Sequence, residues 1–175
     1  MDPLNYDITT QRLLLTPFKA SDLEVFHQIN TDPYVRKYLW DDEVIPKELS
    51  QELLQKNQKH FLDEGYGLWK IIERQTNEII GYTGLWYFFE EAQPQLLYAL
   101  LETYSGQGMA TEAAQSVIHY VFSTLKFDYL LAAMDKPHLP SQNVAKRLGM
   151  RFIQERLEDG KPTVFFRIDN ALSQP

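Results

Sequence analysis

The strongest constraint on the fold is an apolar strand followed by a short loop with two glycines and then by an amphipathic helix. The strand, residues 95–101, contains almost no polar side chain, so we expect it to be central in a sheet and covered on both faces. The helix, residues 109–125, has apolar residues at the i, i+3, i+4, i+7 spacing. In the loop, Gly106 and Gly108 let the backbone approach a ligand closely because neither carries a Cβ.

This loop and the helix that follows it are suited to binding an anion. The first turn of a helix presents unpaired N–H groups and a partial positive charge, and Ala110 keeps that turn small. The alternative is that the glycines serve only the turn from strand to helix. The loop lacks the Gly-Lys-Ser/Thr of a P-loop, and no acidic residue is placed downstream for a ribose contact. An ATPase or a dehydrogenase is therefore disfavoured.

The rest of the chain alternates between strand-like and helix-like patterns. Residues 21–24 form a capping-box sequence that opens a first helix, which we expect Pro33 to end. Pro46 suits the start of a longer helix that ends before Gly65, and residues 140–148 form a short helix. We expect strands at residues 8–16, 68–74, 78–87, 129–134, 151–157 and 163–168. These patterns predict an α/β (α+β) fold with one sheet covered by helices.

Composition and charge narrow the function. The 175 residues fit a single domain over residues 1–175, and the net charge of −7 argues against a nucleic-acid partner. The absence of Cys excludes a disulfide framework, a Cys-ligated metal and a Cys nucleophile, and the four His residues have no metal-ligand spacing. We therefore predict no metal. We also predict no membrane association and a cytoplasmic location, because no apolar run is long enough to span a bilayer.

Several ordered motifs resemble those of the GNAT N-acetyltransferases. The loop segment 104–113 is similar to the family's pyrophosphate-binding motif Gln/Arg-x-x-Gly-x-Gly/Ala: Gly108 and Ala110 match, and Ser105 replaces the leading residue. Residues 10–15 resemble the opening Thr-x-Arg-Leu-x-Leu strand of the RimJ/RimL-like branch. Residues 138–150 resemble its Asn-x-x-Ser-x-x-Val-x-x-Lys-Leu-Gly-Phe motif, in which Ser141 matches and His138 replaces Asn.

The resemblance implies a fold and a ligand. It implies a mixed, mostly antiparallel central sheet that is splayed at the acyl-CoA site and flanked by helices on both faces. Acetyl-CoA, as co-substrate, would lie in that opening, with pantetheine on the strand 97–101 and pyrophosphate on the loop. The binding residues that this implies are Leu100, Leu101, Ser105, Gly106, Gln107, Gly108, Met109, Ala110 and Thr111.

The implied reaction is direct transfer of an acetyl group from the thioester to a primary amine. The backbone N–H of Leu100 or Leu101 would stabilise the oxyanion. In the branch, the Ser at the position of Ser141 is thought to hold the leaving thiolate; the Tyr that many members use four residues later is Ala145 in this chain. The alternative for Ser141 is helix capping. Glu102 is our candidate for the general base, and a solvated loop charge is its alternative.

The acceptor is left open between a protein N-terminus and a small amine, and the oligomeric state between monomer and homodimer. Aromatic residues such as Tyr38, Trp40 and the run 86–89 could line an acceptor pocket or be buried in the sheet and an oligomer contact. His138 lies in a motif region, where we expect a surface role. Two competing functions are a non-catalytic acyl-CoA-binding or regulatory module of the same fold and an interaction domain that binds no CoA.

Overall fold

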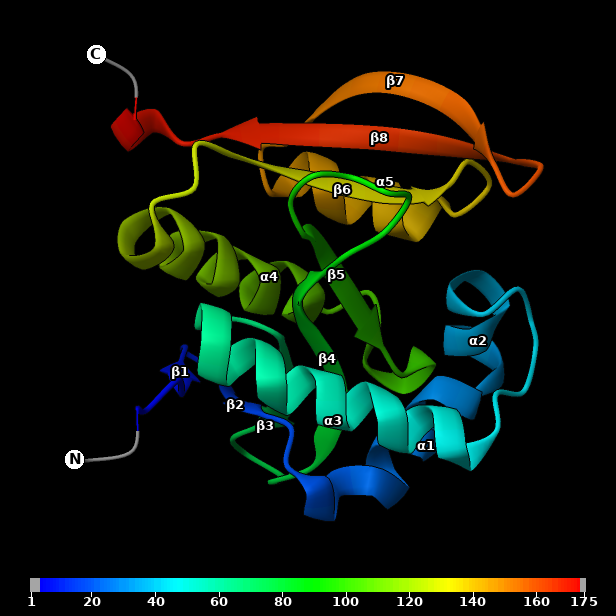
Figure 1. The fold of residues 1–175 in the computed structure, drawn as a ribbon, viewed down its shortest axis with the longest axis vertical. Coiled ribbons are helices and arrows are strands. Elements are labelled where there is room, and N and C mark those ends of the chain that lie inside the picture. Colours follow the sequence, from blue (N-terminus) through cyan, green and yellow to red (C-terminus); the bar gives the residue numbers. More distant parts are fainter. Residues whose placement is uncertain (1–3, 174–175) are drawn as a thin grey trace.

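The computed structural model describes residues 4–173, which form two antiparallel sheets with helices around them (Figure 1). The first sheet has the order β1-β2-β3-β4-β5, made of Ile8–Thr9, Leu13–Pro17, Leu68–Glu73, Ile79–Trp86 and Gln95–Leu100. The second has the order β6-β8-β7, made of Tyr129–Asp135, Lys161–Asp169 and Arg151–Glu158. The helices are α1 Leu23–Thr31, α2 Pro33–Leu39, α3 Lys47–Glu64, α4 Met109–Tyr120 and α5 Leu139–Arg147. A π-helical turn, Val121–Leu125, extends α4.

The two sheets diverge between β5 and β6. These strands are neighbours in space, but each forms its hydrogen-bonded ladder only within its own sheet. In Figure 1 the second sheet lies above the first, with β5 and β6 facing each other. The α/β class with antiparallel sheets flanked by helices is confirmed. The strand expected to be central, β5, is central in the molecule but lies at the edge of its own sheet, so one side of its backbone is free to pair with a ligand.

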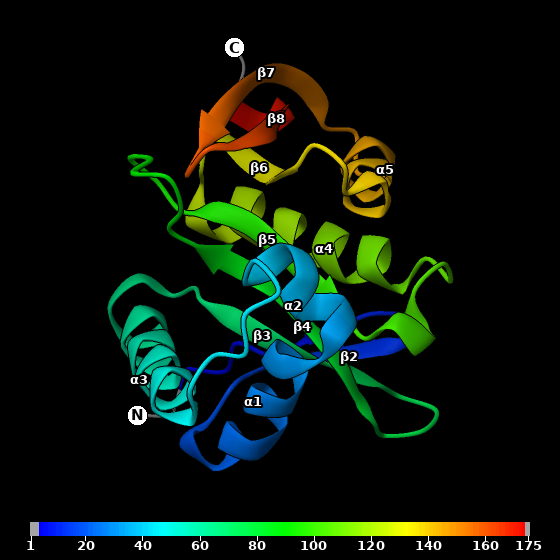
Figure 2. The same ribbon diagram turned by 90° about the vertical axis from the view of Figure 1, so that its right-hand side faces the viewer.

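Helices cover both faces of the first sheet (Figure 2). On one face Ala113, Ala114 and Val117 of α4 pack in one apolar cluster with Leu13, Trp69 and Ile80. On the other face Phe26 of α1 and Leu54 of α3 pack against Tyr82. The alternation of side chains along a strand thus supplies two apolar clusters from one sheet. Within residues 4–173 no helix is both long and apolar enough to cross a membrane.

Three local expectations are corrected. The single strand over residues 8–16 is a hairpin, β1 and β2, with Leu13 N–H and Leu13 O both bonded to the Thr10 hydroxyl. Pro33 begins α2 instead of ending α1, because proline fits the first turn and the Asp32 carboxylate accepts from two backbone N–H groups beyond it. The capping box over residues 21–24 is absent; the Asp22 carboxylate instead accepts from Lys19 N at 2.7 Å.

Candidate functional site

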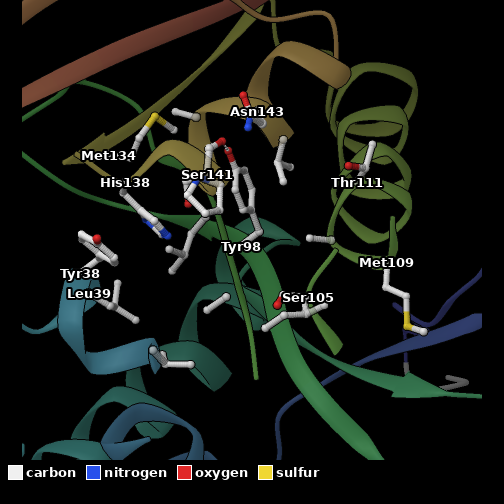
Figure 3. A pocket seen from close by; sticks show the side chains of 18 of the residues that line it. Tyr38, Leu39, Tyr98, Ser105, Met109, Thr111, Met134, His138, Ser141 and Asn143 are labelled. Carbon is white, nitrogen blue, oxygen red and sulfur yellow. Dashed lines mark hydrogen bonds between the residues drawn. The ribbon is translucent and has the colours of Figure 1, made fainter. Parts of the chain in front are cut away.

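A cavity of about 340 Å³ opens between the two sheets, where β5 and β6 diverge. Its walls come from α2, β5, the loop before α4, the first turn of α4, the end of β6 and α5. In Figure 3, Tyr38, Met134 and His138 lie on one side of it, Met109 and Thr111 on the other, and Tyr98 and Ser141 between them. Its lining is mostly apolar and aromatic, with a small number of polar groups, as is usual in small-molecule sites.

The loop before α4 has the geometry that its glycines predict. Gly106 and Gly108 have φ of +73° and +77°, in the left-handed region that disfavours other residues. A Cβ at Gly106 would meet no atom within 4 Å, so the surface above that residue is open. Gly108 is the N-cap of α4 and supplies no side chain to the unpaired N–H groups of the first turn. These N–H groups are available to an anionic ligand.

Thr111 adds a polar atom without a partner to this end of the cavity. Its Oγ1 is buried and forms no hydrogen bond within the described part of the chain. A buried hydroxyl without a partner is costly unless a ligand or water satisfies it. The residues present at the loop therefore fit a phosphate-bearing ligand.

Arg12 holds the loop in place. Its Nη1 donates to Gln107 O at 2.9 Å, and its Nε donates to Glu112 Oε2 at 2.7 Å. The other carboxylate oxygen of Glu112 accepts from Arg12 N at 2.8 Å and from the Thr10 hydroxyl at 2.6 Å. Burial would raise the pKa of Glu112, but these hydrogen bonds and the Arg12 charge lower it below the ordinary value. We call the set Thr10, Arg12 and Glu112 the loop clamp.

Of the two backbone N–H groups expected to stabilise the oxyanion, only that of Leu100 is free among the described residues. Leu101 N–H donates to Ile80 O at 2.9 Å, and Leu101 does not line the cavity. The expectation for the Leu101 N–H is thus corrected, because β4 already uses it. Since successive N–H groups of a strand point to opposite sides, the Leu100 N–H points away from β4, and Leu100 lines the cavity.

Ser141 lines the cavity with its hydroxyl free. It is the third residue of α5, and among residues 4–173 its Oγ makes no hydrogen bond, so helix capping is not its role in this structure. Tyr98 on β5 donates its hydroxyl to Ser141 O at 2.8 Å and ties the start of α5 to the first sheet (Figure 3). Burial raises the pKa of Tyr98, which stays protonated and keeps this bond.

The other predicted site residues divide into two groups. Ser105, Met109 and Ala110 line the cavity together with the glycines, and the Ser105 hydroxyl donates to Glu102 O. Gln107 does not line the cavity, although its carbonyl is bound by the loop clamp. Glu102 is exposed on a 3₁₀ turn and is also outside the lining. The structure therefore does not bring Glu102 together with Ser141, and its role as base stays a prediction.

The end of the cavity opposite the loop contains Tyr38, one of the aromatic residues named as candidates for an acceptor pocket. Tyr38 of α2 and His138 before α5 stack with ring centroids 3.9 Å apart and an interplanar angle of 7°. Burial, with a contribution from the Lys37 charge, lowers the pKa of His138 to about 4, so its ring is neutral at physiological pH. Asp135, at the end of β6, also lines the cavity. Trp40 and the run 86–89, the other aromatic candidates, do not line the cavity, and His138, for which a surface role was expected, is half-buried in its wall.

The acetyltransferase (GNAT) domain family matches residues 12–151 of the chain. The chain belongs to this family, and it is an N-acetyltransferase. The match runs from Arg12 of the loop clamp through the glycine loop and past the end of α5, so it includes both ends of the cavity. It confirms the family that the sequence motifs indicated and the transfer of an acetyl group to an amine.

Individual relatives are distant. The chain is 27% identical over 144 residues to the uncharacterized N-acetyltransferase YnaD of Bacillus subtilis, covering 82% of each. It is 25% identical over 136 residues to the spermidine N(1)-acetyltransferase of Escherichia coli, covering 77% of this chain and 70% of that protein. The structure of RimL, the ribosomal L7/L12 alpha-N-protein acetyltransferase, in complex with coenzyme A superposes with a TM-score of 0.78 at 17% identity, covering 93% and 97% of the two chains. At this identity the likeness to RimL is one of fold.

Proposed function

We propose that this chain transfers an acetyl group from acetyl-CoA to a primary amine by direct attack of the amine on the thioester. The observation that carries the proposal is one continuous cavity that joins the anion-suited loop, the free edge of β5 and the free hydroxyl of Ser141. A relative in fold was solved with coenzyme A, which supports the same ligand for this cavity. A single domain over residues 1–175 and a cytoplasmic location remain predictions.

The loop would hold the pyrophosphate of the ligand. The residues that would contact it are the backbone of Ser105 to Thr111 and the Thr111 hydroxyl, whose Oγ1 has no partner among the described residues. The pantetheine amides would pair with the free edge of β5, which leaves the Leu100 N–H for the thioester oxygen. The loop clamp contributes by fixing the loop before the ligand arrives, which lowers the cost of ordering it on binding.

The transfer step forms a C–N bond and breaks the C–S bond. The amine must lose a proton to attack, because an ordinary aliphatic amine is almost wholly protonated at neutral pH. The Leu100 N–H would stabilise the negative charge on the thioester oxygen as the carbon becomes tetrahedral. The Ser141 hydroxyl would then donate a hydrogen bond to the departing CoA thiolate, and Tyr98 positions Ser141 through its carbonyl.

Two acceptor classes are suggested by proteins that resemble this one. One relative is named for spermidine, and a fold neighbour is named for the α-amine of a ribosomal protein. Both acceptors present a primary amine to the thioester. We therefore extend to this chain only their shared chemistry, a primary ammonium group that must be deprotonated.

The test has two stages. First, thermal unfolding is followed with acetyl-CoA, CoA, ATP and NAD, each in large excess. A ligand at about a hundred times its Kd adds roughly 2.7 kcal/mol, or about 5–11 °C for a domain of this size. We expect a rise with acetyl-CoA and CoA alone, and no rise with any of the four would contradict the proposal.

Second, release of the CoA thiol is measured against a panel of amines. Amine-dependent release is expected. Binding of acetyl-CoA without release for any amine would instead support the alternative, a non-catalytic acyl-CoA-binding module. Sedimentation of the same samples decides between monomer and homodimer.

A further inference from the structure

Asp135 is the one carboxylate among the cavity-lining residues of the described chain. The other charged side chain among these lining residues is Arg147. It lies at the C-terminal end of α5, a helix rise of about 12 Å from Leu139 at the start of that helix. Asp135 belongs to the end that contains Tyr38 and His138, because its carbonyl accepts from His138 N at 2.9 Å. The negative charge of the cavity is therefore concentrated at the end away from the glycine loop.

The Asp135 carboxylate has no direct interaction partner within the described part of the chain. Among residues 4–173 its side chain forms no hydrogen bond and no ion pair. The Lys161 charge acts on Asp135, but Lys161 forms an ion pair with Asp41, and Lys136, the next residue in the chain, forms one with Glu155 at 3.0 Å. Because this half-buried carboxylate has no partner among the described residues, it is available to a positively charged ligand in the cavity.

The surroundings of Asp135 restrict what that ligand is. Met134 precedes it in β6, and Tyr34, Tyr38 and Leu39 of α2 line the same cavity. A polyamine would bring two or more ammonium groups into this space, and only one would find a carboxylate. An amine with one positive charge and an apolar body satisfies both the carboxylate and the apolar walls.

On the basis of the proposed function, we propose that Asp135 binds the acceptor as a primary ammonium ion and takes its proton, and that the acceptor is a singly charged amine with an apolar body. In the balanced step, the ammonium proton moves to the Asp135 carboxylate, and the neutral nitrogen forms a bond to the thioester carbon. The C–S bond then breaks, and the second proton lost by that nitrogen is taken up by the CoA thiolate, so that the products are a neutral amide and the CoA thiol. Burial, with a contribution from the Asp41 charge and against that of Lys161, raises the pKa of Asp135. A raised pKa makes this carboxylate a better proton acceptor than an exposed one.

The experiment compares Asp135→Asn with the wild type on four probes: phenylethylamine, an amidated Ala-Phe dipeptide, diaminobutane, and aniline, which is uncharged at neutral pH. We expect the wild type to prefer phenylethylamine or the dipeptide to diaminobutane, and the preference between those two distinguishes a small monoamine from a peptide N-terminus. Asp135→Asn should lower kcat/KM for the preferred probe by at least about 100-fold, and that for aniline by less than about threefold. The acetyl-CoA-dependent rise in unfolding temperature should persist and reports that the variant is folded.

Two further variants make the result specific. Asp159→Asn removes the same charge from the exposed β7–β8 turn and should match the wild type. Glu102→Gln tests the earlier candidate for the base. A loss of kcat/KM in Glu102→Gln as large as that in Asp135→Asn would overturn the proposal. So would a loss in Asp135→Asn that is equal for aniline and the charged probes, or one under threefold for the charged probes. A wild-type preference for diaminobutane would also overturn it.

A binding measurement separates this proposal from the proposed function. Calorimetric titration of the CoA-saturated protein with phenylethylamine should give a Kd at least about tenfold weaker in Asp135→Asn than in the wild type. If the wild type binds acetyl-CoA but acetylates no amine, the proposed function fails, and this titration still decides whether Asp135 holds an ammonium ion. Equal Kd values in the two proteins would overturn the role of Asp135.

Discussion

The two ends of the cavity are built in opposite ways. At the loop end, Glu112 has both carboxylate oxygens satisfied by Thr10 and Arg12, and Arg12 also holds the Gln107 carbonyl. At the other end, the stacked rings of Tyr38 and His138 join α2 to α5, and the carboxylate of Asp135 has no partner within the described residues.

The difference corresponds to what each end would bind. A ligand that is common to a whole family can be bound by a preformed site whose contacts are backbone N–H groups. An acceptor that differs between relatives is bound by side chains that can be substituted without disturbing the fold. We therefore expect changes at the loop end to affect acetyl-CoA binding and stability, and changes at the other end to affect acceptor choice.

The largest effect at the loop end is expected for Gly108→Val. A β-branched residue at φ +77° is strained by about 2 kcal/mol, and its Cβ would lie 3.5 Å from Arg12 Nη2. We expect the Kd for acetyl-CoA, measured by calorimetry, to rise by at least about 30-fold, since relieving the strain moves the loop. Gly160→Val is the matched control: it has the same φ of +77°, no neighbour within 4 Å and no place in the cavity lining. Equal Kd values in the two variants would contradict the assignment of the loop.

Ser141→Ala should separate chemistry from binding. The hydroxyl is free and would contact only the leaving thiolate, so kcat should fall by about tenfold while the Kd for acetyl-CoA stays within twofold. Tyr98→Phe, which removes the bond to Ser141 O, should give a smaller loss of kcat. Unchanged kcat in Ser141→Ala would remove Ser141 from the mechanism.

Glu112→Gln should weaken the loop clamp. One amide oxygen cannot replace two carboxylate oxygens, so we expect a loss of about 1–2 kcal/mol in the free energy of unfolding and a several-fold rise in the Kd for acetyl-CoA. The folded-state pKa of Glu112 lies below the ordinary 4.5. The stability that Glu112 gives to the folded state is therefore complete above pH 4.5 and is lost as the pH falls below that value. Urea titrations at neutral and acid pH should therefore differ less in the variant than in the wild type.

The last prediction concerns His138→Gln, which removes the stacked ring and changes how stability depends on pH. The pKa of His138 falls from 6.5 to about 4 on folding, so the unfolded chain binds more protons between these values and stability decreases as the pH falls through this interval. In the variant, the slope of the free energy of unfolding against pH should be smaller by up to about 1.4 kcal/mol per pH unit. His119→Gln, on the exposed face of α4, should leave the slope unchanged.

The sequence predicted the glycine loop because its signal is local: a positive φ needs glycine, and a helix follows directly. Ser141 was identified through the resemblance of residues 138–150 to a family motif, and its catalytic role stays a prediction. It did not predict the loop clamp, because Arg12 and Glu112 are 100 residues apart and only the packing of β2 beside α4 brings them together. The contact between Tyr38 and His138 was missed for the same reason, although Tyr38 itself was a candidate for the acceptor pocket. Helix α2 was missed because Pro33 was interpreted as a terminator, although proline is equally suited to a first turn.

The loop clamp also links ligand binding to the order in which the chain assembles. Because Glu112 and the Gln107 carbonyl are held by Arg12, the anion-binding loop is complete only after the hairpin β1–β2 has docked on α4. Any ligand that requires the finished loop must then favour the docked hairpin, by thermodynamic linkage. Hydrogen exchange should accordingly slow in the amides of β1 and β2 when acetyl-CoA is added, although neither strand lines the cavity.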